Sequence, residues 1–304
     1  MPRRADAFTL TNGDLRAEID PGFGGRVTAF WSETPAGRLD WVVPTPASAR
    51  DPRTSHQSGM FPLVPFSNRI ENARFRFEGR EWTLEATQTG RPHAIHGHGL
   101  RAVWDVVERD SRGATLRMAH DGSDWPTAYR VEQRLELTDT ALAARMEVTN
   151  QGSGAMPVGL GWHPFLPMWD GVILVSSFET IWPPVADSIP VGPRALPAEL
   201  DFGGGMALPH GLDTGFGGWN QEALVSWPSM GAGLRFTAGA ALDHVILFSP
   251  EGRDFFCFEP VSHPINALNA LTPDDANAMA VIAPGETFAA WMTLRAEVVA
   301  AGGA

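Results

Sequence analysis

The sequence predicts an all-β protein built as one large antiparallel β-sandwich, and three observations lead to this fold class. Many short segments alternate apolar with polar residues, which is the pattern of a strand with one buried face. The 32 glycines and 25 prolines are spread along the whole length and separate these segments. No segment shows the longer period and the end signals of an amphipathic helix. Many strands with few helices favour two sheets packed face to face.

The alternating segments are distributed from one end of the chain to the other. Two breaks between them, Asn12-Gly13-Asp14 and Leu137-Thr138-Asp139-Thr140, carry the residue types of hairpin turns. We therefore expect antiparallel neighbours at these two places. The clearest predicted strands cover residues 8–10, 15–19, 26–30, 73–78, 115–118, 129–137, 142–149 and 288–294.

The whole chain, residues 1–304, is expected to form a single domain. No proline-rich or Ser/Gly-rich linker divides it, and no internal repeat is found. Residues 182–217 are rich in Pro and Gly and poor in alternation, so we expect an irregular excursion across the sandwich there. Long ordered loops of this kind commonly carry function.

The composition excludes several classes of function. All 23 basic residues are arginines, which excludes a phosphate-binding P-loop and Schiff-base or pyridoxal-phosphate catalysis. A net charge of −12 argues against a nucleic-acid or an anionic-membrane partner. Cys257 is the sole cysteine, so an internal disulfide is excluded. With no signal peptide and no apolar run of membrane length, we expect a soluble, cytoplasmic protein. Its oligomeric state is left open.

Two segments in the first third of the chain combine polar groups with glycine or proline. Asn68 and Arg69 interrupt an apolar run, and a guanidinium can donate several hydrogen bonds to sugar hydroxyls or to a carboxylate. The alternative is a turn asparagine beside a solvated arginine. The second segment contains His93, His96 and His98. A metal site is one interpretation, but no thiolate stands nearby and the spacing is not typical of a metal site. We expect one neutral imidazole to bind a ligand and the other two histidines to be structural or at the surface.

Two later segments place a titratable residue among aromatic ones. His163 lies between Trp162 and Pro164-Phe165, where a pKa near neutrality would suit a general acid. Glu259 ends an aromatic-rich strand, and burial there would raise the basicity of its carboxylate, as a general base requires. A hydrogen-bonded core histidine and a buried structural glutamate are the alternatives.

Together these segments resemble the aldose 1-epimerase (galactose mutarotase) family, and the resemblance covers nearly the whole chain, from Leu15 to Thr293. The motifs that carry it are, in chain order, Asn68-Arg69-Ile70, His96-Gly97 with Trp104 downstream, Trp162-His163-Pro164-Phe165, Leu212-Asp213-Thr214-Gly215-Phe216, Phe258-Glu259-Pro260 ahead of Asn266, and Pro284-Gly285-Glu286 before the last strand.

The resemblance implies a fold, a reaction and a set of site residues. The fold is a large antiparallel β-sandwich, the galactose mutarotase-like supersandwich, whose concave face binds a monosaccharide. The reaction interconverts the anomers of an aldohexose or aldopentose and needs no cofactor and no metal. By position, Glu259 matches the general base and His163 the general acid. The groups that match the holders of the sugar ring are His96, Arg69 and Asp213, with Asn68 added as the neighbour of Arg69.

The chain departs from the family pattern in three places, which bear on the sugar preference more than on the reaction. Gly161-Trp162 precedes His163 where an Asn or Tyr is usual, and Pro260-Val261 follows Glu259 where Thr-Gln is common. The sole tyrosine, Tyr129, lies in an edge-like predicted strand, so Trp and Phe must stack on the sugar. Two other polar features, Glu286 and the Asp243-His244 pair, are expected to lie outside the site.

The chemistry of anomer interconversion agrees with this set of residues. The C1 hydroxyl must lose a proton while the ring oxygen gains one, and a carboxylate and an imidazole on opposite sides of the ring would meet that need. Three alternatives remain open. One is a sugar-binding sandwich without catalysis, and another is a hexose-6-phosphate mutarotase that uses Arg74, Arg76 or Arg101 for the phosphate. The third and most remote is an accessory domain of a polysaccharide lyase or hydrolase.

Overall fold

The computed structural model describes residues 6–50, 57–88, 90–185, 188–270, 275 and 277–299, so both ends of the predicted 1–304 domain lie outside the described residues. Within these residues the chain is nearly all β, and its one α-helix, α1, covers only Ala267–Ala270. The predicted fold class is therefore confirmed. Each predicted alternating segment lies in a strand or, for residues 73–78, contains one, and both predicted turns join antiparallel neighbours.

Two large antiparallel sheets form most of the described structure. In spatial order the larger sheet contains β1 (Phe8–Asn12), β2 (Leu15–Asp20), β3 (Arg26–Thr34), β5 (Met60–Leu63), β15 (Gly161–Pro167), β24 (Phe255–Val261), β23 (His244–Ser249), β20 (Leu212–Gly217), β17 (Thr180–Trp182) and β18 (Arg194–Ala195), with β4 (Gly37–Val42) paired to β3. The smaller sheet contains β10 (Asp105–Arg109), β11 (Gly113–His120), β12 (Tyr129–Leu137), β13 (Ala141–Asn150), β26 (Thr287–Val298), β22 (Ala232–Ala238), β21 (Glu222–Trp227), β16 (Ile173–Ser176) and β19 (Met206–Ala207).

Short elements complete the described chain. Three strand pairs stand apart from the sheets: β14 (Met156–Val158) with β25 (Ala280–Ile282), β6 (Arg69–Ile70) with β9 (Ala94–Ile95), and β7 (Arg74–Phe77) with β8 (Arg80–Thr83). The described 3-10 turns are η1 (Ala47–Ala49), η2 (Glu71–Ala73), η3 (Gly99–Arg101), η5 (Ala198–Leu200), η6 (Phe202–Gly204) and η7 (Pro228–Met230).

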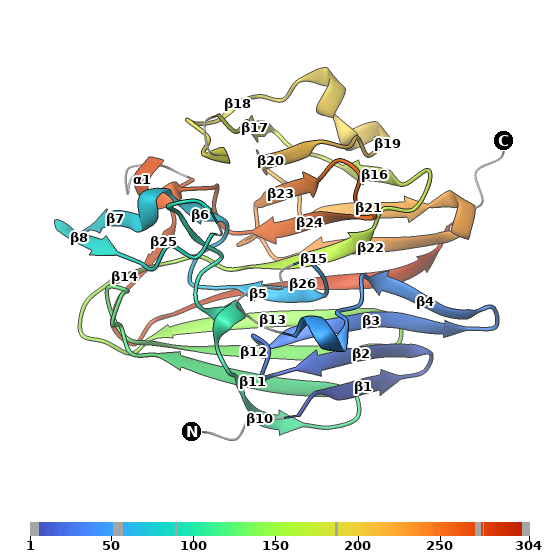
Figure 1. Ribbon diagram of the computed structural model, residues 1–304, viewed down its shortest axis with the longest axis horizontal. Helices are drawn as coiled ribbons and strands as arrows, with labels where there is room; N and C mark the ends of the chain where they lie inside the picture. The colour runs from blue at the N-terminus through green and yellow to red at the C-terminus, as the bar shows by residue number, and fades with distance from the viewer. Residues whose placement is uncertain are drawn as a thin grey trace.

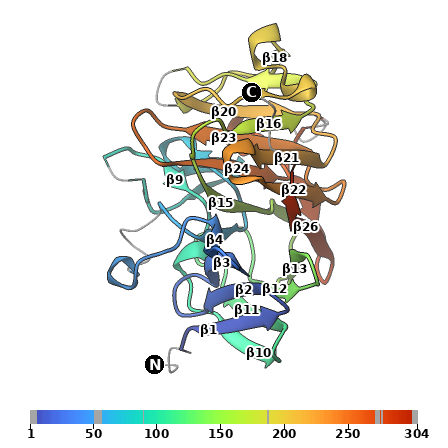
Figure 2. The same ribbon diagram turned by 90° about the vertical axis from the view of Figure 1, so that its right-hand side faces the viewer.

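The two sheets lie face to face. In both sheets the strands from the first half of the chain lie together at one end, and the strands from the second half lie at the other end. Strands β1 and β10 lie at the bottom of Figure 1 and β18 and β19 at the top, and Figure 2 shows the same order from the side. Aromatic side chains fill the space between the sheets: the rings of Phe236 on β22 and Phe258 on β24 lie 4.9 Å apart. A buried amide also bridges the sheets, since Gln133 accepts a hydrogen bond from the Trp162 indole at 2.9 Å and donates to the Gly25 carbonyl at 2.8 Å.

Strand alternation determines which face carries the site. Phe256 and Phe258 point into the core between the sheets, so Cys257 and Glu259 point to the opposite face of the larger sheet, which we call the outer face. In the same way Trp162 is directed inward and His163 outward. A second apolar cluster covers the outer face and contains Phe61, Leu63, Leu100, Phe165, Ile189, Ile246, Phe255, Cys257, Val261 and Ile265.

The structure corrects two expectations from the sequence. Tyr129 is not in an edge strand, because β12 pairs with both β11 and β13, and the residue is fully buried. Residues 182–217 are largely turns and short pieces, as expected, but they end in a regular strand, β20, between β23 and β17. Gly215 hides that strand in the sequence: it has no side chain to alternate, and a Cβ there would lie 3.3 Å from Trp182.

Candidate active site

His163 and Glu259 form a buried pair at the centre of the outer face. Their strands, β15 and β24, are neighbours, and the register pairs Gly161 with Val261 and Phe165 with Cys257, so His163 lies opposite Glu259. The imidazole Nε2 is 3.2 Å from the carboxylate Oε1. Only 8% of the His163 side chain and 2% of the Glu259 side chain are exposed. A proton can therefore be held between an acid and a base that water hardly reaches.

Burial changes the acidity of Glu259 strongly. Desolvation raises the pKa of Glu259 well above its usual value, the nearby Asp213 carboxylate raises it further, and the Arg69 guanidinium opposes both effects. The ionised form is thus a stronger base than an exposed glutamate. The raised basicity agrees with the expectation from the aromatic surroundings of Glu259, and the role of this residue as a general base stays a prediction.

Arg69 and Asp213 meet at the mouth of this site. The Arg69 Nη2 atom is 3.3 Å from Asp213 Oδ2, although the two residues are 144 positions apart in the sequence. The Asp213 side chain is 27% exposed, so it is accessible to a ligand. Asn68 accepts a hydrogen bond from Arg69 Nη1 at 3.0 Å, and it is itself buried. Asn68 therefore orients the arginine.

His96 lies beside His163, with 5.1 Å between the ring centroids. Its φ of 64° is in the left-handed region, which is uncommon for a residue with a side chain. Two hydrogen bonds with Asn68 hold it there: the His96 N–H donates to the Asn68 carbonyl at 2.9 Å, and Nδ1 accepts from the Asn68 N–H at 3.3 Å. Since Nδ1 is an acceptor, a neutral imidazole carries its proton on Nε2, as a hydrogen-bond donor to a ligand would.

The structure brings together all six residues proposed from the sequence, with one difference in geometry. Glu259 and His163 are in contact and are not arranged on opposite sides of a sugar ring. The C1 hydroxyl oxygen and the ring oxygen are both bonded to the same carbon, so groups that reach these two oxygens must themselves be close together. The contact distance is therefore compatible with proton transfer at both oxygens.

Sequence reasoning missed two supporting residues. The Phe61 ring packs on His163 at 4.5 Å and meets His96 edge-on at 5.6 Å, while the Arg26 guanidinium lies 4.7 Å from the same ring. His263 accepts a hydrogen bond from the Ser67 N–H at 3.1 Å and so fixes the segment that leads to Arg69. Phe61 stands in an ordinary apolar run, and Ser67, the partner of His263 Nε2, is 196 residues away in the sequence, so nothing in the sequence marks either residue.

The other polar residues considered from the sequence have local roles. The buried His93 accepts a hydrogen bond from the Asn72 N–H at 3.0 Å, so it is structural, as expected. Glu286 accepts from the Ala283 N–H within its own turn, and His244 pairs with its neighbour Asp243 at 2.6 Å. His98 belongs to a different cluster, described below. Among the described residues, His163, Glu259 and Cys257 are also close enough for their ligand atoms to bind one metal ion.

The comparison with protein families decides the relationship of this chain. The profile of the aldose 1-epimerase family matches residues 6–295.

The chain belongs to the aldose 1-epimerase family. It is also 30% identical to the Escherichia coli K12 protein YphB, whose function is uncharacterised, over 95% of this chain and 98% of YphB.

Solved structures of the same family share the fold. An Escherichia coli K12 protein, assigned provisionally as an aldose 1-epimerase, superposes with a TM-score of 0.86 at 29% identity and covers 96% of this chain and 99% of its own. A GalM/aldose epimerase homologue from C. elegans gives a TM-score of 0.82 at 17% identity, with 96% and 99% coverage. This supersandwich is therefore the fold of an aldose 1-epimerase family member. No described helix has the length and apolar character needed to cross a bilayer.

Proposed function

We propose that this family member is an aldose 1-epimerase that interconverts the α and β anomers of a free aldohexose or aldopentose. The observation that carries the proposal is the buried His163–Glu259 pair, whose Nε2 and Oε1 atoms lie 3.2 Å apart. A sugar that places C1 over this pair would present its hydroxyl to one group and its ring oxygen to the other.

The reaction needs one proton removed and one proton delivered. The Glu259 carboxylate takes the proton of the C1 hydroxyl, and protonated His163 gives its Nε2 proton to the ring oxygen as the bond from C1 to that oxygen breaks. The product is the open-chain aldehyde. After rotation about the C1–C2 bond the two transfers run in reverse, and the ring closes on the other face of the carbonyl. Both residues return to their starting states.

The remaining site residues hold the sugar over this pair. Arg69 supplies a fork of donors, and Asp213 supplies acceptors for hydroxyl groups at the mouth. The His96 Nε2 atom supplies a further donor beside His163. A fixed orientation matters because general acid and base catalysis requires each group to be within hydrogen-bond reach of its proton.

The experiment is polarimetry on freshly dissolved α-glucose or α-galactose with the wild-type protein and the variant Glu259→Gln. We expect the variant to lose nearly all catalysed mutarotation, because an amide cannot take the proton. Sugar affinity should stay within about tenfold, since the amide keeps a similar shape and hydrogen-bonding capacity. An unaltered rate in Glu259→Gln would contradict the assignment of Glu259 as the general base. A wild-type protein that binds sugar without accelerating mutarotation would favour the alternative of a sugar-binding sandwich without catalysis.

The surroundings of two of the three arginines considered for a phosphate favour a free sugar, whereas the third, Arg74, is exposed. Arg76 Nη2 donates to the Gly79 carbonyl in its own hairpin, and Arg101 Nη1 donates to two carbonyls of the segment that carries His96. Both arginines are therefore engaged with backbone. NMR exchange rates on glucose and on glucose 6-phosphate distinguish the two substrates, and a much faster rate on the phosphate would replace the free sugar in this proposal.

A further inference from the structure

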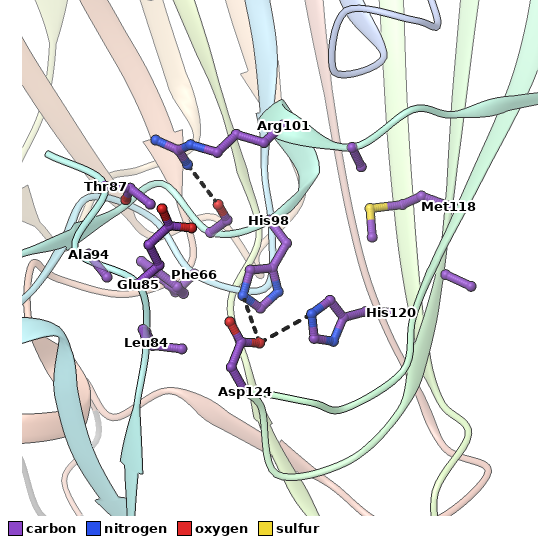
Figure 3. Close-up of a pocket in the computed structure, with 13 residues that line it drawn as sticks. Phe66, Leu84, Glu85, Thr87, Ala94, His98, Arg101, Met118, His120 and Asp124 are labelled. Carbon is purple, nitrogen blue, oxygen red and sulfur yellow. Dashed lines mark hydrogen bonds and ion pairs between the residues drawn. The ribbon is translucent and has the colours of Figure 1, made fainter. Parts of the chain in front are cut away.

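A cavity of about 290 Å³ is lined in part by Ala94, Gly97 and His98, which lie close to His96 in the sequence (Figure 3). Its size is at the lower end of the range of small-molecule sites, which is roughly 300–1,000 Å³. Apolar side chains, among them Phe66, Leu84 and Met118, form part of its wall. The polar side chains that line it are Glu85, Thr87, His98, Arg101, His120 and Asp124.

One wall of the cavity is a cluster of polar side chains around two imidazoles. The His98 and His120 rings stack at 4.2 Å with only 8° between their planes. Asp124 Oδ1 lies 3.4 Å from His98 Nε2 and 3.2 Å from His120 Nε2, as Figure 3 shows. Behind them the hydroxyl of the buried Tyr129 is 2.5 Å from His98 Nδ1. Fixed polar groups therefore face the cavity on this side.

This cluster is arranged unlike a metal site, although its donor atoms are close enough for one. A metal ion lies in the plane of each imidazole that binds it, and two parallel rings stacked at 4.2 Å cannot both contain one ion in their planes. In addition, His120 Nδ1 accepts a hydrogen bond from the Gly122 N–H at 3.1 Å, which leaves the proton of the neutral ring on Nε2. That proton occupies the position a metal ion would need.

The charges in the cavity do not favour an anion either. Glu85 and Asp124 are acidic and Arg101 is basic. Burial, with a smaller contribution from His120, lowers the pKa of His98 to about 4, so its ring is neutral near pH 7. What remains is a mixture of hydrogen-bond donors and acceptors beside apolar walls. Hydroxyl groups both donate and accept, and the C–H faces of a sugar pack on apolar surface, so a neutral polyhydroxy compound matches this lining.

Side chains on the opposite wall of the cavity form hydrogen bonds with the backbone on both sides of His96. Arg101 Nη1 donates to the carbonyls of Ile95 and Gly97, at 3.1 Å each, and one of these bonds is drawn in Figure 3. The Thr87 hydroxyl accepts from the Ile95 N–H at 2.9 Å. Through these bonds the cavity wall supports the left-handed conformation of His96, which faces the proposed active site.

We propose that this cavity is a second binding site, for a neutral polyhydroxy compound of monosaccharide size, and that its occupation stabilises the position of His96. Binding at the cavity is independent of the proposed function, whereas the effect on catalysis rests on it. A ligand in contact with Thr87 and Arg101 restricts the segment that carries His96, so sugar binding at the active site becomes tighter. The two sites are then coupled, and a coupling of about fivefold in affinity is at the low end for linked sites.

The direct test is a titration with methyl α-glucopyranoside, followed through the imidazole NMR signals of His98 and His120. This glycoside cannot open its ring, so it binds without reaction. We expect both signals to move to a saturating value, and two binding events in calorimetry that become one in the variant His120→Ala. Arg117→Ala, on the same strand but outside the cavity, is the matched control and should keep both events. Signals that do not move, or that move with Zn²⁺ or inorganic phosphate but not with the glycoside, would overturn the proposed ligand class.

The coupling is tested by the dependence of the mutarotation rate on the concentration of free sugar. We expect a sigmoidal curve for the wild type, and for His120→Ala a hyperbola with a KM raised about fivefold and kcat unchanged. Identical hyperbolic curves for both proteins would disprove the coupling. If the glycoside moves the imidazole signals of a protein that does not accelerate mutarotation, the second site stands and the proposed function fails.

Discussion

At the scale of single residues, the geometry of the candidate site depends on packing by residues outside the six proposed from the sequence. Phe61 packs under both His163 and His96, at ring distances of 4.5 and 5.6 Å. The Arg26 guanidinium also lies against Phe61, and it is fully buried between the Phe61 and Phe23 rings. Since an imidazole that shifts by about 1 Å can lose about a hundredfold in rate, the rigidity of this packing matters for catalysis.

Phe61→Leu is therefore expected to lower kcat/KM by about 10- to 100-fold, because both imidazoles lose the aromatic ring that packs against them. Phe236→Leu is the matched control. Phe236 is equally buried but packs on Phe258 in the core between the sheets. Both variants should lose about 1–2 kcal/mol of stability, and only the first should lose activity. Steady-state polarimetry beside chemical denaturation measures both quantities, and an equal loss of activity in the two variants would contradict a positioning role for Phe61.

At the scale of elements, adjacent strands and fixed segments bring the site together. Strands β15 and β24 place His163 opposite Glu259, and β20 brings Asp213 to Arg69. The segment that precedes Arg69 is held by His263, whose Nε2 accepts from the Ser67 N–H while Nδ1 lies 2.8 Å from the Pro264 carbonyl. In the neutral form of this buried ring, both nitrogens therefore make hydrogen bonds.

Acid should weaken this attachment. Burial lowers the pKa of His263 to about 4, below the value of about 6.5 in an unfolded chain. As the pH falls, the unfolded chain takes up the proton first. The contribution of His263 to the free energy of unfolding is therefore fully present above about pH 6.5 and decreases between about pH 6.5 and 4. The decrease amounts to about 3 kcal/mol from this residue. His98, which also has its pKa lowered to about 4, adds in the same direction.

The measurement is urea denaturation of the wild type and of His263→Gln at several pH values. Glutamine can still accept from Ser67 but does not titrate, so the variant should lose less stability between pH 6.5 and 4 than the wild type. The exposed His210 provides the control, and His210→Gln should follow the wild-type curve. Equal pH dependence in the wild type and in His263→Gln would show that the buried ring does not carry this effect.

The positions of the strands could be predicted from the sequence far better than the pairing of one strand with another. Residues 129–137 alternate clearly, and they form β12. Alternation reports which side chains are buried but not which strand lies alongside, so the contact of Arg69 with Asp213 could come only from the family resemblance. Strand β20 was not predicted, because Gly215 and Gly217 have no side chains and so interrupt the alternating pattern. The stacking of His98 on His120 joins residues far apart in sequence, and nothing in either segment predicts it.

At the scale of the whole molecule, both sheets combine early and late parts of the chain. Strand β26, at the end of the described chain, lies between β13 and β22 in the smaller sheet. In the larger sheet β15 lies between β5 and β24. Neither half of the chain can therefore complete a sheet alone. The smaller sheet covers the inner face of the larger sheet, so the outer face, with its own apolar cluster, is the one that carries His163 and Glu259.

This arrangement predicts that the chain unfolds as a single cooperative unit. Calorimetry should give one transition whose calorimetric and van't Hoff enthalpies agree, and fluorescence of the many buried tryptophans should follow the same curve. Two separate transitions would contradict the expectation of a single domain over residues 1–304.

The central claim is that Glu259 and His163 act as one acid–base unit on an anomeric centre, and a double-mutant cycle tests it most directly. NMR exchange spectroscopy gives the rate between the α and β signals of glucose for the wild type, Glu259→Gln, His163→Asn and the double variant. We predict that each single change costs about 10²–10⁴ in rate and that the double variant is hardly slower than the worse single one, because the two residues share one step. Costs that multiply in the double variant, or a single variant that keeps the wild-type rate, would contradict the claim.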